Sequence, residues 1–380
     1  MKGIGRTAPY VQEALRDASL HAFDRLIALT EEVDAAALLW AGDVFDHGAP
    51  SLRAQFRLKD GAERLLARDI PVFWAHGNHD HLGSLETRMN WPPNLIQFPP
   101  GEVASYPLMR DGVQLAQVYG ISYPTAAVVE PYWQRFHRDD RAPFAIAVLH
   151  ANVGAQADHD NYAPARLEDL CGAGFDYWAL GHIHHRAVLA EDPPVVYPGN
   201  LQGRHVREDG RKGAYVVQVD ESGRVALAFR PLNPLRWETA TVDCSGLASA
   251  DAVEEAAMAR MAAITLDPDE QGCLIRLVLT GRTPLAGGDQ DWDFLGDRLS
   301  DPEPGPGFRW VEAVDVRWRK PAEPGQPEGL WAEVIAALGA RTASEWTPSR
   351  LDLPWDFEQV RADTLTLLAD LLDEVEPDAH

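Results

Sequence analysis

The sequence predicts an α/β protein built on a parallel sheet, and three observations lead to this prediction. Residues 35–40 and 70–75 are short apolar runs, and residues 52–67 between them carry apolar side chains at helical spacing. Strand, helix and strand in this order form a βαβ unit, which implies a parallel sheet with covered faces. An amphipathic helix is expected before the unit, over residues 11–30. Polar residues follow four of the predicted strands, which is typical of α/β enzymes.

Further elements extend this first domain to residue 228. They are strands over 113–119, 145–149, 177–180, 195–197 and 213–219, and a short helix over 167–171. A second, smaller α/β domain is expected over residues 229–320, where no cluster of ligand-like residues occurs. Its elements are strands over 237–242, 273–280 and 311–318, with helices over 250–263 and 292–299.

Residues 321–380 are expected to form a linker and an acidic helical tail. Residues 321–329 are rich in Pro and Gly, as in linkers, and helices are expected over 331–338 and 360–375. The tail holds thirteen acidic and three basic residues, a net charge of −10 out of −24 for the whole chain. An acidic helix with one apolar stripe either packs on its own protein or docks on a partner.

Composition limits the classes of protein to be considered. Hydrophobic residues make up 46% of the chain, enough for packed cores, and no apolar run approaches the ~20 residues of a membrane span. The N-terminus lacks the pattern of a signal peptide. The cysteines Cys171, Cys244 and Cys273 have no CxxC spacing and cannot all pair, which excludes a zinc ribbon and predicts a cytoplasmic protein. The lack of a long apolar run predicts that it has no membrane association. The negative charge argues against a broadly basic nucleic-acid surface, although metal cations can meet phosphates locally.

The residues that follow the predicted strands offer nitrogen and oxygen ligand atoms. In chain order they are Asp43, then Asn78 with His79 and Asp80, then His150, then His182 with His184. Because the carboxyl ends of parallel strands meet at one edge of a sheet, we expect these side chains to lie together. Carboxylate, amide and imidazole ligands without thiolate favour Mn, Fe or Zn.

This ligand set suits phosphodiester cleavage, which needs a nucleophilic water and neutralisation of the phosphate charge. Two metal ions about 3.5–4 Å apart supply both. Asp43 suits the bridging position between them. The terminal ligands are expected to be Asn78, His150, His182 and His184. His79 is then left for proton transfer or for holding a phosphate oxygen, and Asp80 is expected to orient it.

The same residues carry a resemblance to a known family. Gly42-Asp43-x-x-Asp46, Gly77-Asn78-His79-Asp80, His150 and Gly181-His182-x-His184 resemble the motifs of the calcineurin-like metallophosphoesterase superfamily. Residues 41–46, 177–184 and 197–204 resemble SbcD-type DNA repair exonucleases, and among these the YhaO-like branch. The resemblance implies an αββα sandwich over the first domain and a capping domain over the second.

The resemblance also implies a mechanism and partners. Asp43 would bridge two Mn²⁺ ions, with Zn²⁺ or Fe²⁺ as alternatives, and His79 would be the catalytic histidine. Asn78, His150 and His182 would complete the second metal's shell, and His184 would serve the first metal. Tyr197, Asn200 and Arg204 would lie near the DNA path. The implied activity is exonuclease or endonuclease cleavage of DNA by an activated water. The implied partners are an SbcC-like or YhaN-like ATPase and a second copy of the chain, with which it would form a homodimer.

One part of the family pattern is not matched. Family members open with a strand that ends in Asp-x-His and holds the first metal, but no Asp-x-His occurs before Asp43. The first strand of the sandwich is therefore expected to be missing, and the first metal keeps only Asp43 and His184. Two interpretations compete: the natural protein is longer, or the chain is a degenerate member that binds one metal. Alternative functions are a small-molecule phosphodiesterase or phosphatase, and a catalytically silent binding subunit.

Overall fold

The computed structural model describes residues 8–45, 51–82, 89–154, 160–288, 291–303, 305 and 307–320. The chain folds into two compact units. The first comprises Met1–Ala240, Ala263–Leu277 and Asp293–Val314, and the second Thr241–Ala262, Val278–Trp292 and Asp315–His380. The predicted linker and acidic tail, 321–380, lie outside the described residues.

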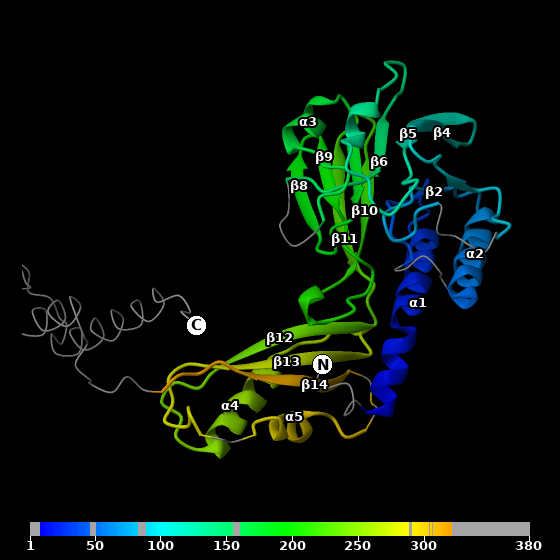
Figure 1. Ribbon diagram of the computed structural model, residues 1–380. Helices are drawn as coiled ribbons and strands as arrows, with labels where there is room; N and C mark the ends of the chain where they lie inside the picture. The colour runs from blue at the N-terminus through cyan, green and yellow to red at the C-terminus, as the bar shows by residue number, and fades with distance from the viewer. Residues whose placement is uncertain are drawn as a thin grey trace, which may run out of the picture. The chain divides into compact units, whose positions relative to one another are not determined.

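Two helices pack side by side at the start of the first unit (Figure 1). α1 spans Pro9–Glu32 and α2 spans Leu52–Leu66, where the Ser51 hydroxyl caps the helix by accepting a hydrogen bond from Ala54 N at 3.2 Å. The pairs Arg53–Asp17, Arg57–Asp24 and Arg64–Glu31 link the two helices along their exposed side. Exposed ion pairs contribute little, so apolar burial holds the helices together.

The strands of the first unit form two main sheets. The smaller sheet is parallel and has the order β1 (Leu38–Trp40), β2 (Val72–Trp74), β3 (Leu95–Gln97). The larger sheet has the order β4 (Ala104–Arg110), β5 (Val113–Gly120), β6 (Ala145–His150), β7 (Tyr177–Gly181), β9 (Pro194–Tyr197), β8 (Ala187–Glu191). Its four central strands are parallel, and β4 and β8 are antiparallel edges.

Alternation of side chains along the strands defines the layers. In β2, Phe73 joins a core shared with Val148 of β6 and Ala179 of β7, so this core lies between the two sheets. The neighbouring Trp74 points the other way, into a core with α1 and α2. In the same manner Leu149 faces away from the sheet–sheet core. The result is a stack of helices, sheet, sheet, and a second helical and loop layer.

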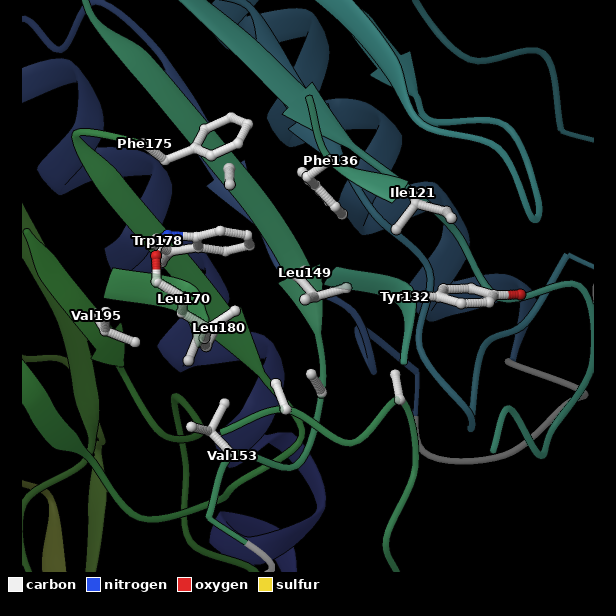
Figure 2. Packing of buried hydrophobic residues seen from close by; sticks show 14 of the residues in the cluster. Ile121, Tyr132, Phe136, Leu149, Val153, Leu170, Phe175, Trp178, Leu180 and Val195 are labelled. Atoms are coloured by element: carbon white, nitrogen blue, oxygen red, sulfur yellow. Dashed lines mark hydrogen bonds between the residues drawn. The ribbon is translucent and has the colours of Figure 1, made fainter. Parts of the chain in front are cut away.

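That outer layer is anchored by aromatic packing on the larger sheet. Figure 2 shows the rings of Phe136, Phe175 and Trp178 in contact, with centroids 5.1–5.9 Å apart. The indole N–H of Trp178 donates to Leu170 O of α3 (Leu167–Gly172) at 3.1 Å. This bond and the burial of Leu170 fix α3 on the face of the sheet opposite to the sheet–sheet core.

The remaining elements follow along the chain. They are the 3₁₀ helices η2 (Tyr132–Arg135) and η3 (Val206–Glu208), the antiparallel pair β10 (Gly213–Val219) and β11 (Val225–Pro231), the sheet β12 (Leu235–Asp243), β13 (Gly272–Thr280), β14 (Phe308–Val316), and the helices α4 (Ala250–Ala262) and α5 (Phe294–Leu299). Within the first unit, Val11 of α1 packs with Leu235 and Phe308, and the Tyr10 hydroxyl donates to Asp301 O at 2.6 Å.

The predicted α/β class is confirmed, and the several sheets are consistent with the expected metallophosphoesterase fold. The predicted helices and strands of residues 8–320 are present, with ends shifted by a few residues. Strands β3, β4, β8 and β11 were not predicted. β4 contains Pro107 and lies at a sheet edge, where a missing N–H is tolerated. Within the described residues, the helices are too short or too polar to span a membrane.

Candidate metal centre

The candidate site is built at the carboxyl ends of β1, β2, β6 and β7. Asp43 follows β1, Asn78 follows β2, His150 ends β6, and His182 follows β7. The two sheets are in contact here. Nδ1 of His150, at the end of β6, lies 2.9 Å from the carbonyl oxygen of Ala41, which follows β1. Gly181 permits this approach, since a Cβ at this position would overlap Ala41 O. A Cβ on Gly77 would in turn lie against the Asp43 carboxylate and the His150 ring.

Two of the predicted ligands have backbone conformations that L-residues seldom adopt. The φ angle is 52° at Asp43 and 100° at His182. Such left-handed positions are unfavourable and occur at functional sites where the surroundings enforce them. At Asp43 the enforcement is visible, because its backbone N–H donates to Asp80 Oδ1 at 3.1 Å and the next N–H, of Val44, donates to Asp80 Oδ2 at 3.0 Å.

The ligand atoms of four predicted residues converge. Those of Asp43, His150 and His182 all lie within 4.8 Å of one another. Asn78 Oδ1 is 2.9 Å from His150 Nε2, which is itself 3.3 Å from Asp43 Oδ2. The side chain of His150 is fully buried and that of Asp43 is 13% exposed. The structure therefore brings these four side chains together at the strand ends.

The chemistry of this cluster fits a cation. A carbonyl oxygen only accepts, so Nδ1 of His150 carries a hydrogen for Ala41 O, and the lone pair of the neutral ring lies on Nε2. Nε2 then faces two oxygen acceptors, Asn78 Oδ1 and Asp43 Oδ2. Among the described residues Asp43 Oδ2 is buried and accepts no hydrogen bond. Either a proton on Nε2 or a bound divalent cation satisfies these acceptors.

The pKa values of Asp43 and His150 reflect the attraction between the carboxylate and the imidazole. Burial by itself raises the pKa of Asp43, but the His150 imidazole and the His79 backbone N–H hold this pKa well below its ordinary value. Burial lowers the pKa of His150, and the Asp43 carboxylate overcomes this and raises it. The lowered pKa of Asp43 keeps it a carboxylate, the form that can bind metal, and the raised pKa of His150 favours its protonated ring.

His182 is oriented in a similar way. Its Nε2 lies 2.8 Å from the carbonyl oxygen of Asp160, so Nε2 carries the hydrogen and Nδ1 is left as the ligand atom. Its ring lies edge-on to that of His150, with centroids 5.1 Å apart. The Tyr123 hydroxyl donates to His150 O at 2.8 Å and so fixes the end of β6, a contact that the sequence did not reveal.

His79 lies beside the cluster, and Asp80 beneath it. The backbone N–H of His79 donates to Asp43 Oδ1 at 2.9 Å, and its half-buried imidazole lies close enough to lower the pKa of Asp43. Asp80 was predicted to orient His79, and this assignment is corrected. Its fully buried carboxylate instead binds the backbone N–H groups of Asp43, Val44 and Gly77 and the Trp74 indole. Asp80 thus joins the loops after β1 and β2.

The remaining predicted residues surround a carboxylate that the sequence analysis missed, Glu208 of η3. Nδ1 of His184 lies 2.7 Å from Glu208 Oε1, and both Asn200 and Arg204 donate to Glu208. Burial raises the pKa of Glu208, but the bonds from His184 and Arg204 hold it well below its ordinary value. His184 is not among the three residues whose ligand atoms form the 4.8 Å group. It follows His182 by two residues in the chain.

Tyr197 was predicted to contact DNA, but the structure places it inside the protein. It is 0% exposed, its hydroxyl donates to Ala151 O at 2.6 Å, and it accepts from Val153 N at 3.0 Å. It therefore supports the loop that follows His150. Asn200 is half-buried and Arg204 is exposed, so both remain accessible to a ligand. Asp46 lies outside the described residues.

Comparison with known proteins agrees with this site. The family model for calcineurin-like phosphoesterases matches residues 16–186, and the model for the middle domain of metallophosphoesterase YhaO matches residues 237–319. An uncharacterized metallophosphoesterase, YhaO of Bacillus subtilis (strain 168), is 40% identical over 261 residues, which is 68% of this chain and 62% of that protein. The DNA double-strand break repair protein Mre11 of Methanopyrus kandleri is 26% identical over 255 residues, covering 60% and 55% of the two chains.

The fold, the candidate metal cluster and these matches place the chain among the metallophosphoesterases. The chain belongs to the calcineurin-like metallophosphoesterase family, in its YhaO branch, and is a distant relative of Mre11. It spans 62% of the YhaO relative and 55% of the Mre11 relative.

Proposed function

We propose that the chain is the nuclease subunit of a DNA repair complex, hydrolysing DNA phosphodiester bonds with divalent metal ions. The observation that carries the proposal is the convergence of Asp43, Asn78, His150 and His182 on one point at the ends of four strands. The relatedness to a DNA double-strand break repair protein supports DNA as the substrate. The match of residues 237–319 supports a second functional region, which we assign to a capping domain over 229–320 that follows a nuclease domain over 1–228.

In this proposal two Mn²⁺ ions are the cofactors, with Zn²⁺ or Fe²⁺ as alternatives. Bound at this site, they supply positive charge for the phosphate and lower the pKa of a water molecule. Asp43 would bridge the two ions, and Asn78, His150 and His182 would hold one of them. His184 would hold the other, and His79 would bind a phosphate oxygen or move a proton from its place beside Asp43. Arg204 and Asn200 bind the DNA backbone. Asp80 holds together the loops that follow β1 and β2.

The partners in this proposal are DNA and an SbcC-like or YhaN-like ATPase, with a homodimer as the form of the nuclease. A small-molecule phosphodiesterase on the same fold is the second candidate, since fold does not determine substrate. A third candidate is a binding subunit that holds one metal, favoured by the absence of His184 from the three-residue ligand group of the described residues.

DNA degradation by the purified chain tests the proposal. We expect Mn²⁺-dependent loss of linear duplex DNA, and a reduction of roughly 10²–10⁴-fold in His79→Ala, the usual contribution of a general acid or base. His137→Ala is the matched control, because His137 is an exposed histidine outside the site. It should retain wild-type activity.

The alternatives give different results in the same assay. Turnover of bis(p-nitrophenyl) phosphate with intact DNA would indicate the small-molecule enzyme. No turnover of either substrate, with one Mn²⁺ bound per chain, would indicate the binding subunit. Both outcomes contradict the nuclease proposal.

A further inference from the structure

A buried carboxylate lies beside the metal centre and has no assigned role in the proposed chemistry. Glu208 belongs to the short η3 element, and its side chain is only 3% exposed. A charge buried to this extent is costly unless it is fully hydrogen-bonded. Its partners therefore indicate its role.

Both oxygens of Glu208 accept hydrogen bonds from residues of its own loop, and one of them also contacts His184. Oε2 accepts from Asn200 Nδ2 at 2.8 Å and from the backbone N–H of Arg204 at 2.8 Å. Oε1 accepts from Arg204 Nη2 at 3.0 Å and lies 2.7 Å from Nδ1 of His184. The groups of Asn200 and Arg204 can only donate, so Glu208 is the acceptor in all these contacts.

Nδ1 of His184 has two polar neighbours, Glu208 Oε1 at 2.7 Å and Arg204 Nη2 at 3.2 Å, and the shorter contact, to the carboxylate, decides which ring nitrogen carries the hydrogen. An acceptor at 2.7 Å from Nδ1 requires Nδ1–H, which leaves the lone pair of the neutral ring on Nε2. In metal sites, one ring nitrogen of a histidine binds the metal and the other commonly donates its hydrogen to a carboxylate. This hydrogen bond fixes the tautomer and the orientation of the ring. His184 is thus prepared to ligate through Nε2.

The backbone of His184 is held by the same loop. Lys212 Nζ donates to His184 O at 3.1 Å, and the backbone N–H of Asn200 lies 3.3 Å from the same oxygen. Gly199 makes this approach possible: its φ is +75°, and a Cβ there would lie 2.8 Å from His184 O. The loop that carries Asn200, Arg204 and Glu208 therefore fixes both the main chain and the ring of His184.

We propose that Glu208 is a positioning residue that joins metal ligation to phosphate binding. Through one carboxylate it sets the tautomer of His184 and holds Asn200 and Arg204 at the same edge of the site. Arg204 is tied at its Nη2 and Nε atoms while its side chain stays 36% exposed, so its guanidinium is oriented yet accessible to an anion. The inference rests on the proposed function, in which His184 is a ligand and Arg204 binds phosphate.

The geometry predicts that a glutamine cannot replace this glutamate. If the amide oxygen of Glu208→Gln faced His184, its NH₂ group would face two donors, Asn200 Nδ2 and Arg204 N. If it were flipped, the NH₂ group would face His184 Nδ1, and the ring would have to move its hydrogen to Nε2. Either arrangement breaks half of the network.

Mn²⁺ titration by calorimetry, on the full chain, is the first test. Glu208→Gln should weaken Mn²⁺ binding by roughly 10- to 100-fold, as changes to such supporting residues do, and should also raise KM for DNA. Glu208→Asp keeps the charge and should lie between Gln and wild type. Glu270→Gln is the matched control, since Glu270 is 6% exposed and accepts hydrogen bonds from Asp267 N and Asn233 Nδ2 elsewhere in the same unit. It should bind Mn²⁺ as wild type does.

The tautomer of His184 gives a second test that needs neither activity nor a folded Glu208 variant. A long-range ¹H–¹⁵N spectrum of metal-free, histidine-labelled protein, with His184→Asn to assign the signal among 13 histidines, should show Nδ1–H and an unprotonated Nε2. An Nε2–H ring in the wild type, or wild-type Mn²⁺ affinity in Glu208→Gln, would overturn the inference. Wild-type protein that binds Mn²⁺ but cleaves no DNA would overturn the proposed function and leave these two tests intact.

Discussion

Two neighbouring groups of polar residues in this molecule differ in how they are satisfied. In the strand-end cluster, Asp43, Asn78 and His150 bring acceptor atoms face to face, and Asp43 Oδ2 accepts no hydrogen bond among the described residues. Around Glu208, both carboxylate oxygens accept hydrogen bonds from the protein, although Asn200 Oδ1 is a buried acceptor without a hydrogen bond in the described structure. The Asp43 carboxylate therefore needs a proton or a cation at its second oxygen, whereas the Glu208 carboxylate needs neither. The difference separates a carboxylate suited to bind a metal from one suited to position its neighbours.

The largest effect is expected where both loops of the cluster depend on one side chain. Asp80→Ala leaves the buried N–H groups of Asp43, Val44 and Gly77 and the Trp74 indole without their acceptor. Each buried donor left unpaired costs roughly 1–3 kcal/mol, so the free energy of unfolding should fall by at least about 3 kcal/mol. Urea unfolding measures this, and a loss below about 1 kcal/mol would contradict the role given to Asp80.

The second prediction concerns the charge of the cluster. A ligand at 100 times its Kd stabilises a protein by about 2.7 kcal/mol, so Mn²⁺ at that concentration should raise the free energy of unfolding of the wild type by this amount. Asp43→Asn removes the carboxylate that the cation requires, and Mn²⁺ should then have little effect. Urea unfolding with and without Mn²⁺ is the measurement. An equal gain in both proteins would place the metal elsewhere.

The third prediction tests the close approach of β7 to β1 at the cluster by adding a methyl group there. Gly181→Ala places a methyl group against Ala41 O, where β7 approaches β1, and overpacking of this kind costs typically 1–3 kcal/mol. Gly172→Ala is the control, because a Cβ there meets nothing within 4 Å. Urea midpoints should fall for Gly181→Ala and stay near wild type for Gly172→Ala. Equal midpoints for the two variants would contradict the close approach of the two strands.

The smallest effect is expected at the rim of the network. Arg204→Lys keeps the charge but loses the paired contacts of the guanidinium, and one such hydrogen bond contributes about 1 kcal/mol. DNA affinity, measured by fluorescence anisotropy, should fall by roughly fivefold, while Mn²⁺ affinity stays near wild type because His184 keeps its bond to Glu208. A large loss of Mn²⁺ binding would show that Arg204 belongs to the metal centre itself.

The same contrast explains what could be predicted from the sequence. Asp43, Asn78, His150 and His182 each follow an apolar strand, so the parallel sheet brings them to one edge. Their convergence was therefore predictable from local pattern. The role of Asp80 was not, because its partners are backbone N–H groups whose direction depends on the left-handed conformation of Asp43.

Glu208 and Tyr197 show the limit of local pattern more clearly. Glu208 ends the three-residue helix η3, which is too short to carry a periodic pattern, and its partners come from the segments that follow β7 and β9. Tyr197 ends an apolar strand in a family motif, but alternation along β9 points it into the same core as Val195. Its contacts required the three-dimensional structure.

The central claim is that the strand-end cluster holds a divalent metal through a carboxylate and imidazoles. X-ray absorption of the Mn²⁺-loaded full chain tests this most directly, because imidazole rings give outer-shell scattering that oxygen ligands lack. We predict a mixed nitrogen and oxygen shell with imidazole scattering, which is reduced in His150→Ala. A shell of oxygen ligands alone, or a spectrum unchanged by His150→Ala, would contradict the assignment.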